Sequence, residues 1–287
     1  MESSNDHNKP GENINIIVVG GGPAGVQAAM RARELGAQVT LLESERLGGT
    51  AFNKGPAPVR TLARAARLRA DTSLFSTFGL VGDPPSVNFG EAIQNANRVA
   101  AHANEVWKLT KLVRDMDIVV VDEVGPARFV DTTTLEIEDG RKFTGDRIIL
   151  AVGGTPRKLS IPGNELGLTF HDLWELEELP EKVTVVGGSA TGCQLASILL
   201  DFGVKVDIIE FADRLTPPSD VDISRGLEEA FSKRGMNVLT GTRSDAIEEA
   251  NDHLKVLYTK GEETGSLETG AVFLMVGWPA NNLGTES

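Results

Sequence analysis

The stretch from Ile14 to Gly25, with the sequence INIIVVGGGPAG, decides the fold of this chain. An apolar run of strand length ends in a glycine turn, and a helix rich in small residues is expected from Val26 to Leu35. A second apolar run then ends at Glu43, roughly 20 residues after the first glycine of the turn. Strand, glycine turn, helix, strand and terminal acid follow one another in the order of a dinucleotide-binding unit.

Each glycine of the turn has a separate predicted role. Gly20 allows the tight turn, Gly22 lets the backbone approach a pyrophosphate, and Gly25 lets the helix and the strand pack closely. The first amides of the helix and its positive end favour an anion, and Glu43 is placed to accept from ribose hydroxyls. The alternative is a glycine-rich turn that serves packing alone. We predict a dinucleotide site.

The same pattern returns in the second half of the chain. Residues 182–186 predict a strand, GGSATG at 187–192 predicts a turn, and a helix and a further strand follow. That strand ends at Glu210, at the same offset from Gly187 as Glu43 has from Gly20. The chain therefore contains an internal repeat on the scale of a domain.

The predicted fold class is α/β, with two Rossmann-like dinucleotide-binding domains. Residues 13–156 are predicted to form the first domain, with short strands near 127–143 that resemble a β-meander, and residues 157–287 the second. The polar residues 1–12 are predicted to be a disordered tail. Apolar residues at helical spacing predict one long helix over residues 89–113.

Composition excludes several classes of function. The formal net charge of −13 disfavours a general nucleic-acid or anionic-membrane surface, so neither partner is expected. No apolar run approaches transmembrane length, and the N-terminus lacks an apolar signal-peptide core, which predicts a cytoplasmic protein. The single cysteine, Cys193, excludes an intrachain disulfide. The four histidines show no metal-ligand spacing, so no metal site and no catalytic acid or base are predicted.

In this order, the motifs resemble those of the FAD-dependent pyridine nucleotide–disulfide oxidoreductases, the family of dihydrolipoamide dehydrogenase, glutathione reductase and mercuric reductase. Besides the two glycine turns and their acids, the resemblance rests on GGT at 48–50, GPARF at 125–129, AVGG at 151–154, IPG at 161–163 and VG at 276–277. It implies that the first domain binds FAD and the second NADH or NADPH. The nicotinamide would then reduce the flavin.

The chain departs from the family at the redox loop. Where family members carry two cysteines, this chain has Ala51 and Pro56, which cannot perform thiol–disulfide exchange. Cys193 lies beyond the second glycine turn and is expected to be a buried packing residue. The family often pairs a lysine with a glutamate near the flavin; the matching positions here hold Arg60 and Gln194. We expect Arg60 to act as fixed positive charge or to lie on the surface.

Two further departures concern the cofactors. Ser189 replaces the middle glycine of the second turn, which adds a small side chain. Glu210 favours NADH because a carboxylate repels a 2′-phosphate, while the nearby Arg214 keeps NADPH possible.

The chain stops at Ser287, where the family continues with a segment that closes the FAD site and a dimerisation domain. We therefore expect a form truncated at its C-terminus relative to the family, either a fragment or a natural short form, without the family's dimer.

The predicted cofactor contacts come from these motifs: Gly20, Gly22, Pro23, Ala24, Gly25, Glu43, Gly49, Thr50, Asn53, Arg60, Ala127, Gly153, Gly187, Ser189, Ala190, Thr191, Gly192, Glu210 and Gly277. Two functions remain open. One is an enzyme that transfers hydride from NADH to FAD and passes electrons to a small-molecule acceptor without a redox disulfide. The other is a non-catalytic remnant or sensor that binds FAD, NAD or both.

Overall fold

The computed structural model describes residues 14–282, without the side chains of residues 103–107. The contacts between residues divide the described chain into two compact units. The first comprises residues 14–58, 98–154 and 280–282, and the second comprises residues 59–97 and 155–279. The predicted domain boundary after residue 156 stays a prediction. The contacts themselves group residues 59–97 with the second unit, whereas the sequence placed them in the first.

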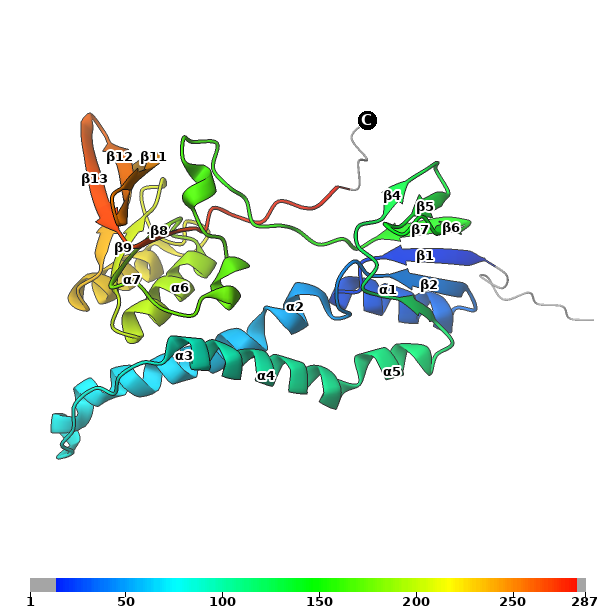
Figure 1. Ribbon diagram of the computed structural model, residues 1–287, viewed down its shortest axis with the longest axis horizontal. Helices are drawn as coiled ribbons and strands as arrows, with labels where there is room; N and C mark the ends of the chain where they lie inside the picture. Colours follow the sequence, from blue (N-terminus) through cyan, green and yellow to red (C-terminus); the bar gives the residue numbers. More distant parts are fainter. Residues whose placement is uncertain (1–13, 283–287) are drawn as a thin grey trace, which may run out of the picture. The chain divides into compact units, whose positions relative to one another are not determined.

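The first unit is built on a parallel four-stranded sheet with the order β3-β2-β1-β7 (Figure 1). Its strands are β1 (Asn15–Val19), β2 (Gln38–Leu42), β3 (Val119–Val121) and β7 (Arg147–Leu150), and its helices are α1 (Pro23–Glu34), α2 (Gly49–Asn53) and α5 (Leu109–Arg114). The predicted meander is present as an antiparallel sheet of β4 (Arg128–Phe129), β5 (Thr134–Glu136) and β6 (Lys142–Thr144). Apolar residues of β1 and β2 pack against α1 and α5 to form the core.

The second unit repeats this arrangement. Its parallel sheet has the order β10-β9-β8-β14, so the strand that precedes the glycine turn again lies between the next strand and the last one. The elements are β8 (Lys182–Val186), α6 (Ala190–Asp201), β9 (Lys205–Ile209), α7 (Val221–Lys233), β10 (Asn237–Leu239) and β14 (Ala271–Leu274). An antiparallel sheet is inserted before β14, with strands β11 (Thr242–Ala250), β12 (His253–Lys260) and β13 (Glu263–Thr269). Short 3₁₀ helices span Asn164–Leu166 (η2) and Asp172–Glu175 (η3).

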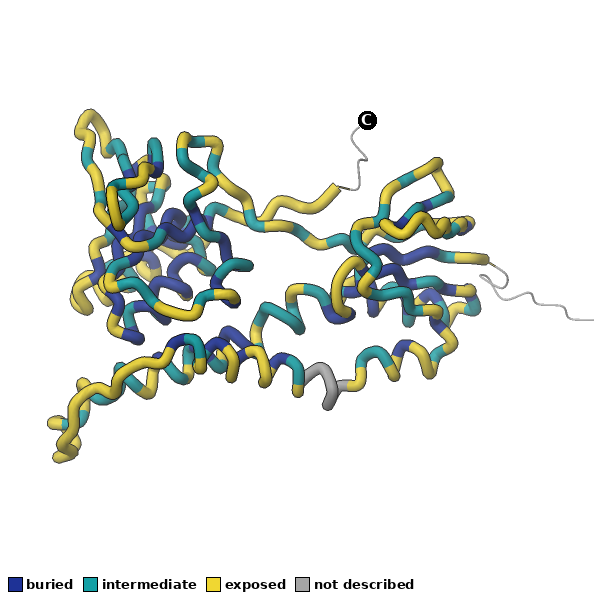
Figure 2. Tube along the Cα trace, in the orientation of Figure 1, coloured by how far each residue is buried: buried dark blue, intermediate teal, exposed yellow. Residues whose placement is uncertain are grey.

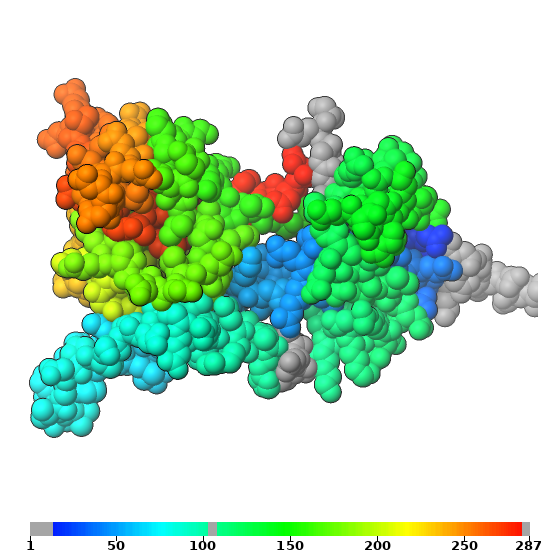
Figure 3. All heavy atoms as spheres, in the orientation of Figure 1, coloured from blue at the N-terminus to red at the C-terminus, as the bar shows by residue number. Residues whose placement is uncertain are grey.

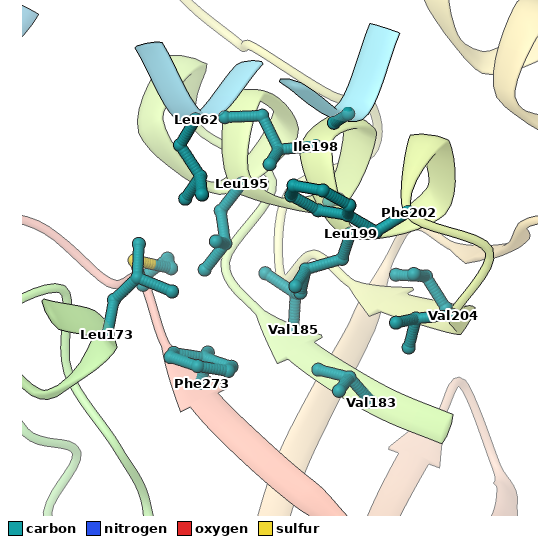
Figure 4. Packing of buried hydrophobic residues seen from close by; sticks show 14 of the residues in the cluster. Leu62, Leu173, Val183, Val185, Leu195, Ile198, Leu199, Phe202, Val204 and Phe273 are labelled. Carbon is teal, nitrogen blue, oxygen red and sulfur yellow. The ribbon is translucent and has the colours of Figure 1, made fainter. Parts of the chain in front are cut away.

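Two helices from the first half of the sequence complete the core of the second unit. They are α3 (Pro56–Ala70), which is followed by the 3₁₀ helix η1 (Asp71–Phe78), and α4 (Phe89–Trp107). Figure 4 shows Leu62 of α3 beside Leu195 and Ile198 of α6, above Val185 of β8. The ring of Phe89 meets the ring of Phe202 edge-on at 5.6 Å. These contacts explain why residues 59–97 group with the second unit.

The connection between α3 and α4 is exposed. Figure 2 colours most of residues 73–88 as exposed, and Figure 3 shows this segment, in cyan, projecting from the rest of the second unit. Phe78 and Val81 are among its exposed apolar side chains. The prediction of one long helix over residues 89–113 is wrong, because Lys108 adopts a left-handed backbone with φ of 45° and separates α4 from α5. No helix in the described part of the chain has the length and apolarity to cross a membrane.

Candidate functional site: two glycine turns with paired acids

The first glycine turn requires glycine at two of its positions. Gly20 has φ of +102°, and a Cβ placed there would lie 2.2 Å from the carbonyl oxygen of Ala151, just after β7. A Cβ at Gly25 would lie 1.7 Å from the carbonyl oxygen of Gly20. The turn and the helix therefore approach each other more closely than any side chain permits. This close approach sets the start of α1 directly against the carboxyl end of β1.

The start of α1 is open to an anion. Gly22 precedes the helix with φ of −71°, and a Cβ built there would meet no described atom within 4 Å. The described first turn of α1 carries no acidic side chain, and Pro23 stands at its first position. Free amides, the positive helix end and empty space in front of them suit a pyrophosphate. The residues present therefore fit the phosphate part of a dinucleotide.

Glu43 is held beside this turn by backbone amides. It is buried, its Oε2 accepts from the Gly21 N–H at 2.5 Å, and its Oε1 accepts from the Glu45 N–H at 2.9 Å. A carboxylate offers about four acceptor positions, so lone pairs remain for the hydroxyls of a ribose. The two amides fix the orientation of the carboxylate before any ligand arrives.

The loop after Glu43 returns to the glycine turn. Gly48, with φ of 107°, donates its N–H to the carbonyl oxygen of Gly21 at 2.8 Å. A Cβ at Gly49 would lie 2.9 Å from the Cα of Gly22. Thr50 is exposed, and the Asn53 amide donates to the carbonyl oxygen of Arg46 at 3.0 Å. The GGT motif thus brings α2 against the first site, and Gly48 belongs to this site although only Gly49 and Thr50 of the motif are among the predicted contacts.

The remaining predicted contacts lie in different places. Gly153 follows β7 with φ of +65°, and a Cβ added there would meet no described atom within 4 Å. Ala127 is half-buried against the core between the sheet and the meander. Gly277 is exposed, with φ of +111°. Arg60 is exposed on α3, and both Arg60 and Gly277 group with the second unit. The contact of Arg60 with a flavin therefore stays a prediction from the resemblance.

The contacts of the second glycine turn repeat those of the first glycine turn. Gly187 has φ of +111°, and a Cβ at Gly192 would lie 1.9 Å from the Gly187 carbonyl oxygen. Glu210 Oε2 accepts from the Gly188 N–H at 2.6 Å, and its Oε1 accepts from the Ala212 N–H at 2.7 Å. The acid at the end of the second strand thus has the same two kinds of backbone partner as Glu43.

Ser189 fits its place in the second turn without strain. Its backbone is extended, with φ of −67° and ψ of 176°, and its hydroxyl donates to the Met275 carbonyl oxygen at 3.4 Å. Ala190 and Thr191 begin α6, whose described first turn carries no acidic side chain. The second site therefore offers a phosphate the same free amides and helix end as the first.

Cys193 lies inside α6, directly behind the second turn. It is buried, and its S–H donates to the Gly188 carbonyl oxygen at 3.3 Å. Burial, reinforced by the negative charges of Glu210 and Glu228, raises the pKa of the Cys193 thiol to about 12. Among the described residues, no group of three or more His, Cys, Asp or Glu side chains is placed to hold a metal ion.

Native Cys193 is expected to resist thiol reagents. With its pKa raised to about 12, the thiol is almost fully protonated at pH 8. The nucleophilic thiolate then amounts to roughly one part in ten thousand. Ellman's reagent at pH 8 should therefore label the native chain very slowly and the urea-unfolded chain completely. Rapid labelling of the native chain would show that the thiol is accessible and ionised.

Comparison with known proteins identifies the family. The family model of the pyridine nucleotide-disulphide oxidoreductases matches residues 14–287. The chain belongs to this family. It is 32% identical over 283 residues to the dihydrolipoyl dehydrogenase of Bacillus subtilis, covering 93% of this chain and 59% of that enzyme. It is 30% identical over 278 residues to the dihydrolipoyl dehydrogenase of Mycobacterium leprae, covering 93% of this chain and 58% of that enzyme.

Solved structures agree with this assignment. The flavoprotein disulfide reductase RclA of Escherichia coli has a TM-score of 0.78 and 25% identity, covering 94% of this chain and 58% of that chain. LpdA of Mycobacterium tuberculosis has a TM-score of 0.81 at 24% identity, covering 95% of this chain and 60% of that chain, and shows the fold alone. The predicted family and the predicted fold class are confirmed. Members of this family use FAD and NAD(H). The chain spans under two thirds of the length of these relatives.

Proposed function

We propose that this chain is a flavin-dependent NADH oxidoreductase, with FAD bound by the first unit and NADH by the second. Electrons would pass from the flavin to a small-molecule acceptor without a redox disulfide. The observation that carries the proposal is the repeated site: two glycine turns, each with an open helix start and an acid fixed by two backbone amides. RclA is named as a flavoprotein disulfide reductase and the relatives in sequence as dihydrolipoyl dehydrogenases. By the resemblance, however, Ala51 and Pro56 stand where the redox cysteines of the family lie.

The residues of each unit would divide the work as follows. In the first unit, the amides at the start of α1 would hold the pyrophosphate of FAD, and Glu43 would hold its ribose hydroxyls. In the second, the start of α6 and Glu210 would hold the corresponding parts of NADH. When bound, a flavin supplies the redox centre that accepts a hydride and returns electrons. Arg60 would add a fixed positive charge, since an arginine stays protonated; this role rests on the resemblance.

The main test is the visible absorbance of the purified chain after incubation with FAD and removal of free cofactor. We expect a bound flavin band that NADH bleaches under anaerobic conditions and that an added quinone restores. A chain that binds both cofactors without bleaching would instead be the non-catalytic binding protein or sensor. Lipoamide and glutathione disulfide are expected to give no turnover above background, with an authentic disulfide reductase as the positive control. Substantial disulfide turnover by the pure chain would overturn the proposal.

The FAD assignment has its own matched variants. Glu43→Ala should weaken FAD binding strongly, because it removes one or two charge-assisted hydrogen bonds of about 1.5–3 kcal/mol each. It also leaves the amides of Gly21 and Glu45 without their carboxylate acceptor. Glu45→Ala is the control, since the Glu45 residue is exposed and contributes its amide to Glu43. Equal FAD affinity of the two variants by titration would show that Glu43 does not contact the ribose.

Two further proposals concern the partners and the cellular location of the protein. The net charge of −13 supports a protein without a nucleic-acid partner. We also propose a cytoplasmic location, in keeping with a reaction that consumes NADH. Fractionation of the cells that produce the protein, followed by immunoblotting, tests this location directly.

A further inference from the structure

The loop of residues 211–219 follows Glu210 and forms part of the second site. The Thr216 N–H donates to the carbonyl oxygen of Gly188 at 2.7 Å, which ties the loop to the glycine turn. The buried side chain of Leu215 fills the space beside Gly188, where an added Cβ would lie 2.5 Å from it. The Ala212 N–H binds Glu210 from the other end of the loop. The position of this loop therefore sets the position of both the turn and the acid.

Arg214 directs its hydrogen bonds into its own loop. Its Nη2 donates to the carbonyl oxygen of Pro217 at 2.9 Å, and its Nη1 pairs with Asp213 Oδ1 at 3.2 Å. Its Nε is buried and meets no hydrogen-bond acceptor within the described part of the chain. The guanidinium thus spans the residues on both sides of Thr216, and we call these two contacts the Arg214 clasp.

Thr216 holds an unfavourable conformation between the two ends of the clasp. Its φ of 46° lies in the left-handed region, where a β-branched residue is a genuine outlier. Its hydroxyl is buried, with no partner among the described residues. In the first unit the corresponding hydrogen bond to the turn comes from Gly48, which takes a left-handed backbone readily. Strained residues persist only when their surroundings hold them, and they gather at binding sites.

We propose that Arg214 is a positioning residue that holds Thr216 in its left-handed conformation, and that it is not a ligand for a 2′-phosphate. The inference rests on the proposed function, because it concerns how that same site selects NADH. A phosphate is bound best by a guanidinium with two donors free. Arg214 already uses one N–H of each Nη on Asp213 and Pro217, and its Nε is buried, so no pair of neighbouring donors faces a ligand without breaking the loop contacts. The carboxylate of Glu210 stands at the proposed ribose position. Glu210 therefore favours NADH, and Arg214 gives NADPH no compensating advantage.

The decisive comparison is between Arg214→Ala and the double variant Arg214→Ala with Thr216→Gly. Calorimetric titration with NADH should show about tenfold weaker binding for Arg214→Ala, because the loop loses its fixed position. The NADPH affinity should fall by a similar factor. Arg214→Lys should behave like Arg214→Ala, since an ammonium cannot reproduce the planar fork. The double variant should regain most of the NADH affinity, since glycine needs no clasp to adopt the left-handed backbone.

Arg234→Ala serves as the control for general destabilisation. Arg234 pairs with Asp201, the last residue of α6, at the opposite end of that helix from the glycine turn. This variant should lower the melting temperature without weakening NADH binding below the transition. A loss of NADPH affinity alone in Arg214→Ala, or unchanged affinity for both cofactors, would overturn the inference, as would a failure of Thr216→Gly to restore binding.

Melting temperatures separate this inference from the proposed function. If Arg214 holds Thr216, then Thr216→Gly should raise the melting temperature more in the Arg214→Ala background than in the wild type. Such non-additivity is the signature of two coupled residues. Additive shifts would refute the clasp even if both cofactors bind as proposed. A wild-type chain that binds neither cofactor would refute the proposed function. The melting temperatures of the wild type, the two single variants and the double variant would still decide the role of Arg214.

Discussion

Gly25→Ala is expected to destabilise the first unit severely, and Gly192→Ala to do the same to the second. The added Cβ would lie 1.7 Å from the Gly20 carbonyl oxygen in one case and 1.9 Å from the Gly187 carbonyl oxygen in the other. Backbone atoms cannot swing aside as a flexible side chain can, so helix and strand must separate. Overpacking usually costs about 1–3 kcal/mol and occasionally more, and these clashes belong at the upper end. Thermal unfolding and cofactor titration of each variant measure the effect.

Gly22→Ala is the matched control for these variants. It makes the same chemical change three residues before Gly25, but its Cβ would meet no described atom within 4 Å, and its φ of −71° suits any residue. The melting temperature should therefore stay close to that of the wild type. The methyl group nevertheless enters the space in front of α1, so FAD affinity should fall. If Gly22→Ala and Gly25→Ala lose stability equally, the close packing of helix and strand is not what requires glycine.

Glu210→Ala is expected to change the choice of cofactor. The wild type should bind NADH at least tenfold more tightly than NADPH, because a carboxylate facing a 2′-phosphate costs several kcal/mol and about 1.4 kcal/mol is tenfold. In the variant, NADH should bind more weakly, since its ribose hydroxyls lose their acceptor, and the penalty on NADPH should disappear. The ratio of NADH affinity to NADPH affinity therefore decreases, because NADH binding weakens and NADPH binding strengthens. Calorimetric titration of both cofactors against both proteins measures it.

Glu210→Gln separates the effect of the negative charge from the effect of removing the side chain. The amide oxygen can still accept from the N–H of Gly188 or of Ala212, so the loop should keep its position, while the repulsion of a phosphate is removed. NADPH affinity should rise while NADH affinity falls only modestly. An unchanged ratio in both variants would mean that Glu210 does not face the ribose. Equal affinities for the two cofactors in the wild type would mean that Arg214 offsets Glu210.

Sequence reasoning predicted those parts of the fold that local physics determines. The strands β1, β2, β8 and β9 are mostly apolar, as buried parallel strands are, and the left-handed glycines Gly20 and Gly187 mark the turns after β1 and β8. The strands β11 and β13 were not predicted, because the segments TRSDAIEEA and ETGSLET are largely polar. Their strand conformation comes from pairing with β12 rather than from their own pattern.

The parts of the candidate site that follow from local sequence pattern could likewise be predicted. Glycine spacing and the two terminal acids identified both turns, since each residue type has a direct geometric reason to be there. The conformation of Thr216 could not be predicted, because threonine normally avoids a left-handed backbone and tertiary contacts hold it there. The break at Lys108 was missed for a similar reason, since lysine is a good helix former and no proline or glycine marks the interruption.

The discontinuous second unit limits how this protein can be divided or recombined. The sheet of β8, β9, β10 and β14 lies within residues 155–279, but its covering helix α6 packs against α3 and α4 from residues 59–97. A gene fragment encoding only residues 157–287 would present Leu195, Ile198 and Phe202 to water. If one contiguous stretch were exchanged between homologous genes, the apolar face of α6 would pack against α3 and α4 residues of a different protein. Successful chimaeras must therefore carry both segments from one parent.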